Sequence, residues 1–233
     1  MEAKNPEHIG IILDGNRRFA KRLMMKPWMG HEWGFKKIER MMEWCDELGI
    51  KELTLFVFST ENFNRPKNEF DFLMDIFRKT FDDLMTDKRL EEYDIRIRFI
   101  GRLELFPNDI QKKAKALMEK TKNHERHIIN VALGYGGRAE LADAARRMAE
   151  DVANGRLKPE EMNDDTIKNY LYMTDEPDLI IRTGGEKRTS NFLIYQGAYA
   201  EWFFLEKLWP EFEKEDLINV IEEYKQRDRR FGK

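Results

Sequence analysis

Short apolar runs that alternate with longer helix-periodic stretches constrain the fold of this sequence more than any other feature. The runs are rich in Ile, Val, Leu and Phe and end in turn residues; they span residues 8–14, 52–59, 95–101, 127–137, 178–185 and 201–210. The stretches between them repeat apolar residues at helical spacing and include residues 31–49, 70–87, 109–120 and 139–155. Strands that are apolar on both faces and separated by helices favour a parallel sheet. We therefore expect an α/β fold with a mostly parallel central sheet of about six strands, flanked by helices.

Composition indicates one soluble globular domain over residues 1–233. The chain is 41% hydrophobic and 36% charged, and no run reaches the ~18 apolar residues of a membrane span. The 41 Lys and Arg nearly balance the 44 Asp and Glu, so no nucleic-acid partner is indicated and any anion site must be local. A lone Cys45 cannot form an internal disulfide, and no signal-peptide pattern is seen. A cytoplasmic protein is expected.

The first apolar run ends in Asp14-Gly15-Asn16, followed by Arg17 and Arg18. In open α/β sheets, ligands bind at the carboxyl ends of strands. A turn at Gly15, a helix capped by Asn16 and two guanidiniums predict a phosphate site. A carboxylate there calls for a divalent cation, so Asp14 is a candidate Mg²⁺ ligand. A plain turn with solvated arginines explains this segment, taken alone, equally well.

Two later runs also end in polar clusters. Residues 59–66 hold hydroxyl, amide and guanidinium groups that could close over a diphosphate, with Phe63 covering an apolar chain, although common loop residues are the simpler explanation. Residues 178–191 gather three cations, among them Arg182 and Arg188, and hydroxyl side chains around a Gly-Gly turn, a composition that binds phosphoryl oxygens. The spacings of ordinary nucleotide-binding loops are absent.

Three further features admit two interpretations each. Glu201 lies among bulky apolar residues, either as a salt-bridge partner or as a second ligand of the same cation. His31 is a capping or core histidine, or a diphosphate contact. The apolar face within residues 70–85 is core, or lines a channel for a long hydrocarbon. A phosphate site beside an apolar channel points to a prenyl diphosphate.

Five segments carry a resemblance to a known family. They are residues 8–21, Gly30-His31, 58–66, 182–196 and 198–204. In order and spacing they resemble the cis-prenyltransferases of the undecaprenyl diphosphate synthase type, over nearly the whole chain. The resemblance implies a homodimeric α/β enzyme with a hydrophobic substrate tunnel. Such an enzyme uses Mg²⁺ and adds isopentenyl diphosphate repeatedly to an allylic prenyl diphosphate, so that each new double bond is cis and the product is a polycis-polyprenyl diphosphate.

The resemblance also implies roles for individual residues. Asp14 matches the catalytic aspartate that engages Mg²⁺, Asn62 a residue assigned to proton removal, and Glu201 a second metal-associated acid. Because a neutral amide is a poor base, a substrate diphosphate oxygen is an equally good proton acceptor. Peripheral membrane contact during product release is also expected. A substrate-binding role is implied for Gly15, Asn16, Arg17, Arg18, Phe19, His31, Ser59, Thr60, Glu61, Phe63, Arg65, Arg182, Arg188, Thr189 and Ser190.

The chain departs from the family at a few positions. Pro27, with Lys26 beside it, stands where many members have an arginine. Lys187 stands where histidine is frequent, and an ammonium group cannot ligate Mg²⁺. The ending Arg230-Phe231-Gly232 resembles one that reaches a partner's active site in some relatives.

Two other functions fit the sequence less well. A metal-dependent phosphohydrolase with Asp14 as nucleophile would need a second aspartate where Asn16 stands. A noncatalytic subunit that binds a catalytic partner is disfavoured because the chain keeps the family's functional residues. Product length and the allylic primer, whether geranyl, farnesyl or geranylgeranyl diphosphate, stay open at this point.

Overall fold

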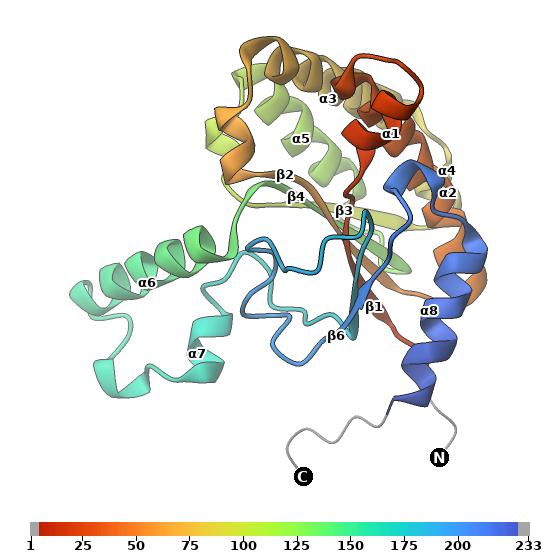
Figure 1. The fold of residues 1–233 in the computed structure, drawn as a ribbon. Helices are drawn as coiled ribbons and strands as arrows, with labels where there is room; N and C mark the ends of the chain where they lie inside the picture. The colour runs from red at the N-terminus through yellow and green to blue at the C-terminus, as the bar shows by residue number, and fades with distance from the viewer. Residues whose placement is uncertain (1–4, 228–233) are drawn as a thin grey trace.

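A computed structural model describes residues 5–227, so the role expected for Arg230-Phe231-Gly232 lies outside the described residues. Every neighbouring strand pair is parallel, in the order β3-β4-β2-β1-β5-β6 (Figure 1). The α/β fold and its six strands are thereby confirmed, each strand falling within an apolar run. The strands are β1 (His8–Ile12), β2 (Glu52–Ser59), β3 (Ile95–Ile100), β4 (His127–Tyr135), β5 (Leu179–Arg182) and β6 (Glu201–Phe204).

The helices between the strands match the periodic stretches. The four stretches singled out above correspond to α2, α3, α5 and α6, with ends that differ by a few residues. Gly49 ends α2 in the left-handed conformation, with φ of 72°, as a helix C-terminus favours. The helices are α1 (Asn16–Arg22), α2 (Gly30–Leu48), α3 (Lys67–Thr86), α4 (Arg89–Glu92), α5 (Asn108–Thr121), α6 (Gly137–Ala153), α7 (Asp164–Lys168) and α8 (Lys214–Gln226).

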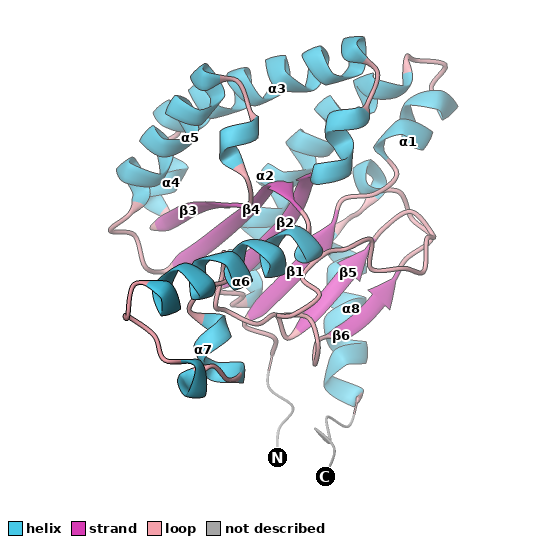
Figure 2. Cartoon of the chain, turned by 90° about the vertical axis from the view of Figure 1, so that its left-hand side faces the viewer, coloured by secondary structure: helices cyan, strands magenta, loops and turns pink. Residues whose placement is uncertain are grey.

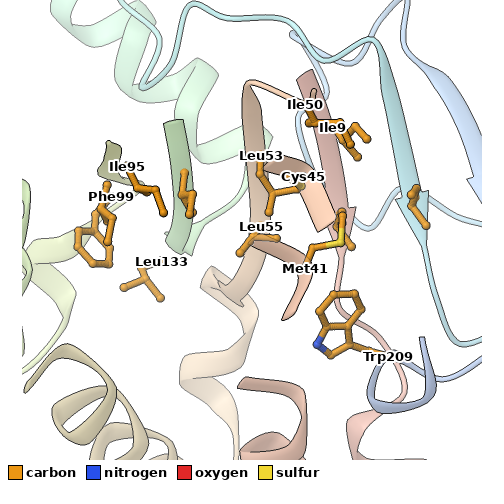
Figure 3. Packing of buried hydrophobic residues seen from close by; sticks show 14 of the residues in the cluster. Ile9, Met41, Cys45, Ile50, Leu53, Leu55, Ile95, Phe99, Leu133 and Trp209 are labelled. Atoms are coloured by element: carbon orange, nitrogen blue, oxygen red, sulfur yellow. The ribbon is translucent and has the colours of Figure 1, made fainter. Parts of the chain in front are cut away.

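The two faces of the sheet are covered differently. One face packs against α2, α3, α5 and α8 and forms the larger core, in which Cys45 is buried as expected (Figure 3). On the other face, strand residues such as Ile12 and Ile180 pack against Met173, Phe192 and Leu193 of the irregular chain between α7 and β6. Helices α6 and α7 project from this side (Figure 2). Since α6 buries few side chains, most of this face is closed by irregular chain.

Parallel pairing brings the functional segments to one edge. Ile12, the last residue of β1, is in register with Phe56 of β2 and with Arg182, the last residue of β5. The chain that follows each of these three strands therefore begins at the same edge of the sheet. None of the helices in residues 5–227 combines the length and apolar character needed to cross a membrane.

Candidate active site

Asp14 lies just beyond β1, and its backbone is fixed by neighbouring segments. Its carbonyl oxygen accepts hydrogen bonds from the Trp209 N–H at 2.9 Å and the Thr183 hydroxyl at 2.8 Å. Gly15 follows with φ of 109°, and a Cβ atom there would lie 2.9 Å from the Cα of Leu208. Only glycine fits this turn, which holds the Asp14 carboxylate at the sheet edge.

Arg182 is a buried cation, only 4% exposed, that joins two of the predicted clusters. Its Nη2 donates to Asp14 Oδ2 at 2.9 Å, while its Nη1 donates to Ser190 Oγ at 2.6 Å and to the Arg188 carbonyl oxygen. Its Nε is buried with no hydrogen-bond partner in the described part of the chain. Leaving a buried donor unpaired is costly, so a bound oxygen acceptor at this position would be stabilised.

Two adjoining cavities at this edge form what we call the anion pocket. Their volumes are about 680 and about 370 Å³, and both are lined by Asp14, Asn16, His31, Arg65 and Arg188. Seven basic side chains and three acidic ones line the pair, in a chain whose net charge is −3. Such a local excess of guanidiniums is suited to phosphate groups. The predicted residues that line it are Asp14, Gly15, Asn16, Arg17, Arg18, His31, Ser59, Glu61, Asn62, Arg65, Arg182, Arg188 and Ser190.

The start of α1 corrects one expectation. Gly15 is the N-cap of α1, and Asn16 is its first residue, so the prediction that Asn16 caps the helix is wrong. The Asn16 Nδ2 instead donates to the Leu13 carbonyl at 3.0 Å. A Cβ atom at Gly30 would lie 1.9 Å from the Asn16 carbonyl oxygen. This close contact between α1 and the start of α2 places His31 in the anion pocket.

A buried carboxylate that the sequence analysis missed supports two of the arginines. Glu69 in α3 is 2% exposed; its Oε1 accepts from Arg65 Nη1 at 2.8 Å, and its Oε2 lies 3.8 Å from Arg17 Nη2. The same Arg65 nitrogen lies 3.3 Å from His31 Nε2. Burial, followed by the charges of Arg65 and Arg17, lowers the pKa of His31 to about 3. His31 is therefore neutral near pH 7 in this arrangement.

The segment after β2 folds back on itself as a short 3-10 turn, Thr60–Asn64. Asn62 Oδ1 accepts the Ser59 N–H at 3.1 Å, which leaves its Nδ2 as a donor without a partner in the described chain. Burial alone would raise the pKa of Glu61, but hydrogen bonds from its own N–H, Ser59, Thr60 and Asn191 outweigh it and lower that pKa. The turn thus presents a fixed amide donor and an ionised carboxylate to the pocket.

An apolar cavity of about 490 Å³ adjoins the anion pocket between the sheet and helices α2 and α3. Phe35, Ile38 and Val57 line both. Within the apolar face predicted for residues 70–85, Phe81 and Leu84 line this cavity, whereas most of the others are core. The site therefore joins a cationic end to an apolar end. Further lining residues include Met42, Leu55, Ile76, Ile97, Phe99, Ile129 and Val131.

Four predicted substrate contacts do not line the anion pocket. Phe19 packs against Trp33, with ring centroids 5.7 Å apart. Phe63, within the 3-10 turn, packs against the core residues Phe58 and Phe106. Thr60 donates to Glu61 at 3.1 Å, and Thr189 is exposed. The two aromatic residues thus take packing positions beside the site.

Glu201 is not brought to Asp14 within this chain. It begins β6, in register with Leu179, which in turn is paired with Ile9, five residues before Asp14. At ~3.3 Å per residue, this register separates the two acids by roughly 16 Å along the strands. Glu201 Oε2 accepts from Arg227 Nη1 at 2.8 Å, as in the salt-bridge interpretation.

Arg138 and Asn191 line the anion pocket as well and were not among the predicted site residues. The Arg138 N–H donates to Asn191 Oδ1 at 2.9 Å. Both follow strands that end at this edge, so the polar residues after each apolar run were the signal for them.

A metal ion at this site would need ligands from the substrate as well as from the protein. Within residues 5–227 no group of three or more His, Cys, Asp or Glu is arranged to hold an ion. The Asp14 side chain is about one-third exposed to the pocket. Mg²⁺ is commonly bound by one or two carboxylates together with substrate phosphates. The residues present therefore fit a divalent cation that arrives with a diphosphate.

Comparison with known proteins places the chain in a family. Residues 12–232 match the family model described as "Putative undecaprenyl diphosphate synthase". The chain is 48% identical to the tritrans,polycis-undecaprenyl-diphosphate synthase (geranylgeranyl-diphosphate specific) of Pyrococcus horikoshii, over 98% of this chain and 87% of that protein. An isoprenyl transferase of Thermus thermophilus is 43% identical, over 98% and 89%.

Solved structures agree with this match. Lavandulyl diphosphate synthase from Lavandula x intermedia, in complex with dimethylallyl diphosphate, superposes with a TM-score of 0.92 at 33% identity, covering 98% of this chain and 99% of that chain. A probable undecaprenyl diphosphate synthase from Campylobacter jejuni gives 0.82 at 33% identity, covering 99% and 100%. With the matched residues, the fold and the charged pocket in agreement, the chain belongs to the undecaprenyl diphosphate synthase family of prenyltransferases.

Proposed function

We propose that this chain is a cis-prenyltransferase that adds isopentenyl diphosphate repeatedly to an allylic prenyl diphosphate. The observation that carries the proposal is the junction of the anion pocket with the apolar cavity at Phe35, Ile38 and Val57. A diphosphate fits the arginine-rich end and its hydrocarbon the apolar end. The names of the relatives agree with this activity, and nothing found supports a phosphohydrolase or a noncatalytic subunit.

The proposed chemistry rests on charge that is placed before reaction. When the C–O bond next to an alkene ionises, negative charge develops on the leaving diphosphate. Arg17, Arg18 and neutral His31 would bind the allylic diphosphate, and their fixed donors stabilise that charge in the transition state. Arg182, Arg188 and Ser190 would bind isopentenyl diphosphate, whose double bond then attacks the allylic carbon. Loss of a proton completes one round of elongation.

We propose Mg²⁺ as the divalent cation, bound by Asp14 together with diphosphate oxygens. Bound there, Mg²⁺ would help neutralise the diphosphate as it leaves. Arg182 holds the Asp14 carboxylate in place for this task through its hydrogen bond to Oδ2. Glu201 is paired with Arg227 and takes no part in this proposal.

For the proton, we propose a diphosphate oxygen as acceptor, with Asn62 as its positioning partner. The Oδ1 of Asn62 is occupied by the Ser59 N–H, so the amide turns a donor toward the pocket. A donor cannot take a proton, but it can hold a diphosphate oxygen near the carbon that releases one.

Geranylgeranyl diphosphate is the proposed primer, because relatives of 43 to 48% identity are named as specific for it. Labelled isopentenyl diphosphate with Mg²⁺ and geranyl, farnesyl or geranylgeranyl diphosphate, in turn, tests both activity and primer. We expect fastest incorporation with geranylgeranyl diphosphate and a long-chain product on chromatography. Absence of incorporation with every primer would overturn the proposed function.

The Asp14→Asn variant is the first testable prediction. It keeps the volume of the side chain but removes the charge, so turnover should fall by about 10²- to 10³-fold. Asp71→Asn, an exposed carboxylate on α3 outside the pocket, is the matched control and should retain activity. Thermal unfolding of both variants reports whether the fold is intact. Undiminished turnover in Asp14→Asn contradicts the proposed role.

A homodimer is also proposed, on the resemblance alone. Analytical ultracentrifugation of the purified chain tests it directly, through a sedimenting mass of twice 28.0 kDa.

A further inference from the structure

Apolar side chains are exposed together where α1 turns into α2. Leu23 is 49% exposed, Met24 98% and Trp33 48%. Phe19 packs against Trp33 and extends the same surface. We call the surface made by Phe19, Leu23, Met24, Trp28 and Trp33 the α1–α2 corner. Figures 1 and 2 both show this part of the chain at an outer edge of the molecule.

The backbone at Met24 does not favour a methionine. Helix α1 ends with the Met24 N–H donating to the Lys21 carbonyl and the Met25 N–H donating to the Ala20 carbonyl. In this type of helix ending the residue at the position of Met24 is left-handed and is usually glycine. Met24 has φ of 56° there, and its side chain is almost entirely in solvent. The side chain is thus kept at a strained position without contributing to the core.

Basic residues outnumber acidic ones around the corner, where Glu32 is also exposed. Lys21, Arg22, Lys26 and Lys36 are all exposed. Arg22 pairs with Glu211 at 2.7 Å, while the three lysines form no ion pair within the described chain. Lys26 Nζ lies 5.6 Å from the Trp28 ring centroid, and Lys36 Nζ lies 5.9 Å from that of Trp33. Exposed Met and Leu with tryptophans and unpaired lysines are the composition of segments that bind the interface of an anionic bilayer.

We propose that the α1–α2 corner docks on an anionic lipid bilayer, with Leu23 and Met24 inserted among the acyl chains and the lysines on the headgroups. The corner adjoins the site, since Lys21 lines the anion pocket and Lys36 lines the apolar cavity. A long-chain product would therefore leave the cavity next to the bilayer. That use of the surface rests on the proposed function, whereas the docking itself needs no substrate.

Vesicle sedimentation without substrate tests the docking. The purified chain is mixed with vesicles of phosphatidylcholine plus phosphatidylglycerol, or of phosphatidylcholine alone. We expect binding mainly to the anionic vesicles. Met24→Gly should lower the partition coefficient about tenfold, because one buried apolar side chain is lost. Lys26→Gln should lower it about fivefold on anionic vesicles only.

Weaker vesicle binding by Met24→Gly could not be attributed to misfolding. Glycine suits the left-handed position, so this variant should melt at or above the temperature of the unaltered chain. Leu105→Ser, at a residue as exposed as Leu23 but remote from the corner, is the matched control and should bind vesicles normally. Unchanged binding by Met24→Gly, an equal loss in Leu105→Ser, or equal binding to both vesicle types would each overturn the proposal. Elongation measured separately shows whether the proposed function stands.

Discussion

Glu69 shows how a residue without substrate contact can decide the shape of a charged pocket. It is buried beneath Arg65 and Arg17, and its two oxygens face one arginine each. The neighbouring guanidiniums of Arg65 and Arg17 repel each other. The buried carboxylate offsets that repulsion, so it acts as a positioning residue for Arg65 above all.

Glu69→Gln should therefore weaken binding more than chemistry. Without the carboxylate, Arg65 loses its 2.8 Å ion pair, and we expect KM for the allylic substrate to rise about tenfold with little change in kcat. Steady-state kinetics with varied primer concentration measures this. Asp71→Asn on the same helix, whose carboxylate pairs with exposed Lys67, should leave both constants unchanged. A fall in kcat at constant KM would assign Glu69 a different role.

Most residues that the sequence could identify lie at the end of an apolar run or within a few residues of it, as Asp14 and Ser59 do. Glu69 does not, because its importance arises from burial under Arg65, which only the packing of α3 establishes. Glu201 shows the opposite case. Its segment matches the family motif, but the register of β6 places it at the other end of the strands. Its place at the start of an apolar run already indicated this end of the strand, and the metal role that the family motif implies stays a prediction.

At the scale of elements, α3 serves two purposes along one face. Leu73, Met74 and Phe77 are buried in the core. Ile76 and Leu84 line the apolar cavity, and Phe81 belongs to both. Apolar residues at the same helical spacing form both the core contacts and the cavity lining. The sequence alone therefore could not tell which of them line the cavity. Hydrophobic spacing predicted the helix, and the position of α2 decided where space remains.

Leu84→Trp should shorten the product. A larger ring at this position fills part of the cavity that would hold the growing hydrocarbon, so elongation should stop at least one isoprene unit earlier. Chromatography of labelled products after removal of the diphosphate measures chain length. Met85→Trp is the matched control, because the neighbouring Met85 packs against the core and does not line the cavity. If both variants made products of the same chain length, the cavity would not be what sets chain length.

The sequence also explains why strands were predicted better than helix ends. Most strands of the parallel sheet leave continuous apolar runs, which are hard to miss, and β3, where Arg96 and Arg98 alternate with apolar residues, keeps the period of a strand. The start of α1 depends instead on the left-handed turn at Gly15, which makes glycine the cap and Asn16 the first helical residue. Helix α8 was not singled out, although Leu217, Val220, Ile221 and Tyr224 are buried at helical spacing.

At the scale of the whole molecule, one buried histidine links stability to pH. His8 begins β1, and its Nε2 lies 2.7 Å from the Thr54 hydroxyl. Burial lowers the pKa of His8 from 6.5 to about 4. At a pH between these two pKa values, His8 binds a proton in the unfolded chain but not in the folded chain. His8 therefore makes the free energy of unfolding fall as pH drops below about 6.5, by up to about 1.4 kcal/mol per pH unit for this group alone.

Comparison with His8→Asn isolates this contribution. Between pH 7 and pH 5, the unaltered chain should lose about 2 kcal/mol more stability than the variant, whatever the variant's stability at pH 7. Urea unfolding at the two pH values measures the difference. His127→Asn, which removes a histidine paired with Asp46, is the control and should keep the steep dependence. If His8→Asn and the unaltered chain lost the same free energy of unfolding between the two pH values, residues other than His8 would be responsible for the pH dependence.

The ion pair between Asp14 and Arg182 joins positions 168 residues apart. During synthesis on the ribosome, β1 is complete long before β5 exists. The Asp14 carboxylate can pair with nearby Arg18, but it cannot meet the buried Arg182 guanidinium until nearly four-fifths of the chain has been made. An N-terminal fragment would hold Arg17 and Arg18 but not Arg182, whose guanidinium donates to Asp14 Oδ2. On the mechanism that we propose, catalytic competence therefore arises only late in synthesis, so a stalled or truncated polypeptide would not consume isoprenoid precursors.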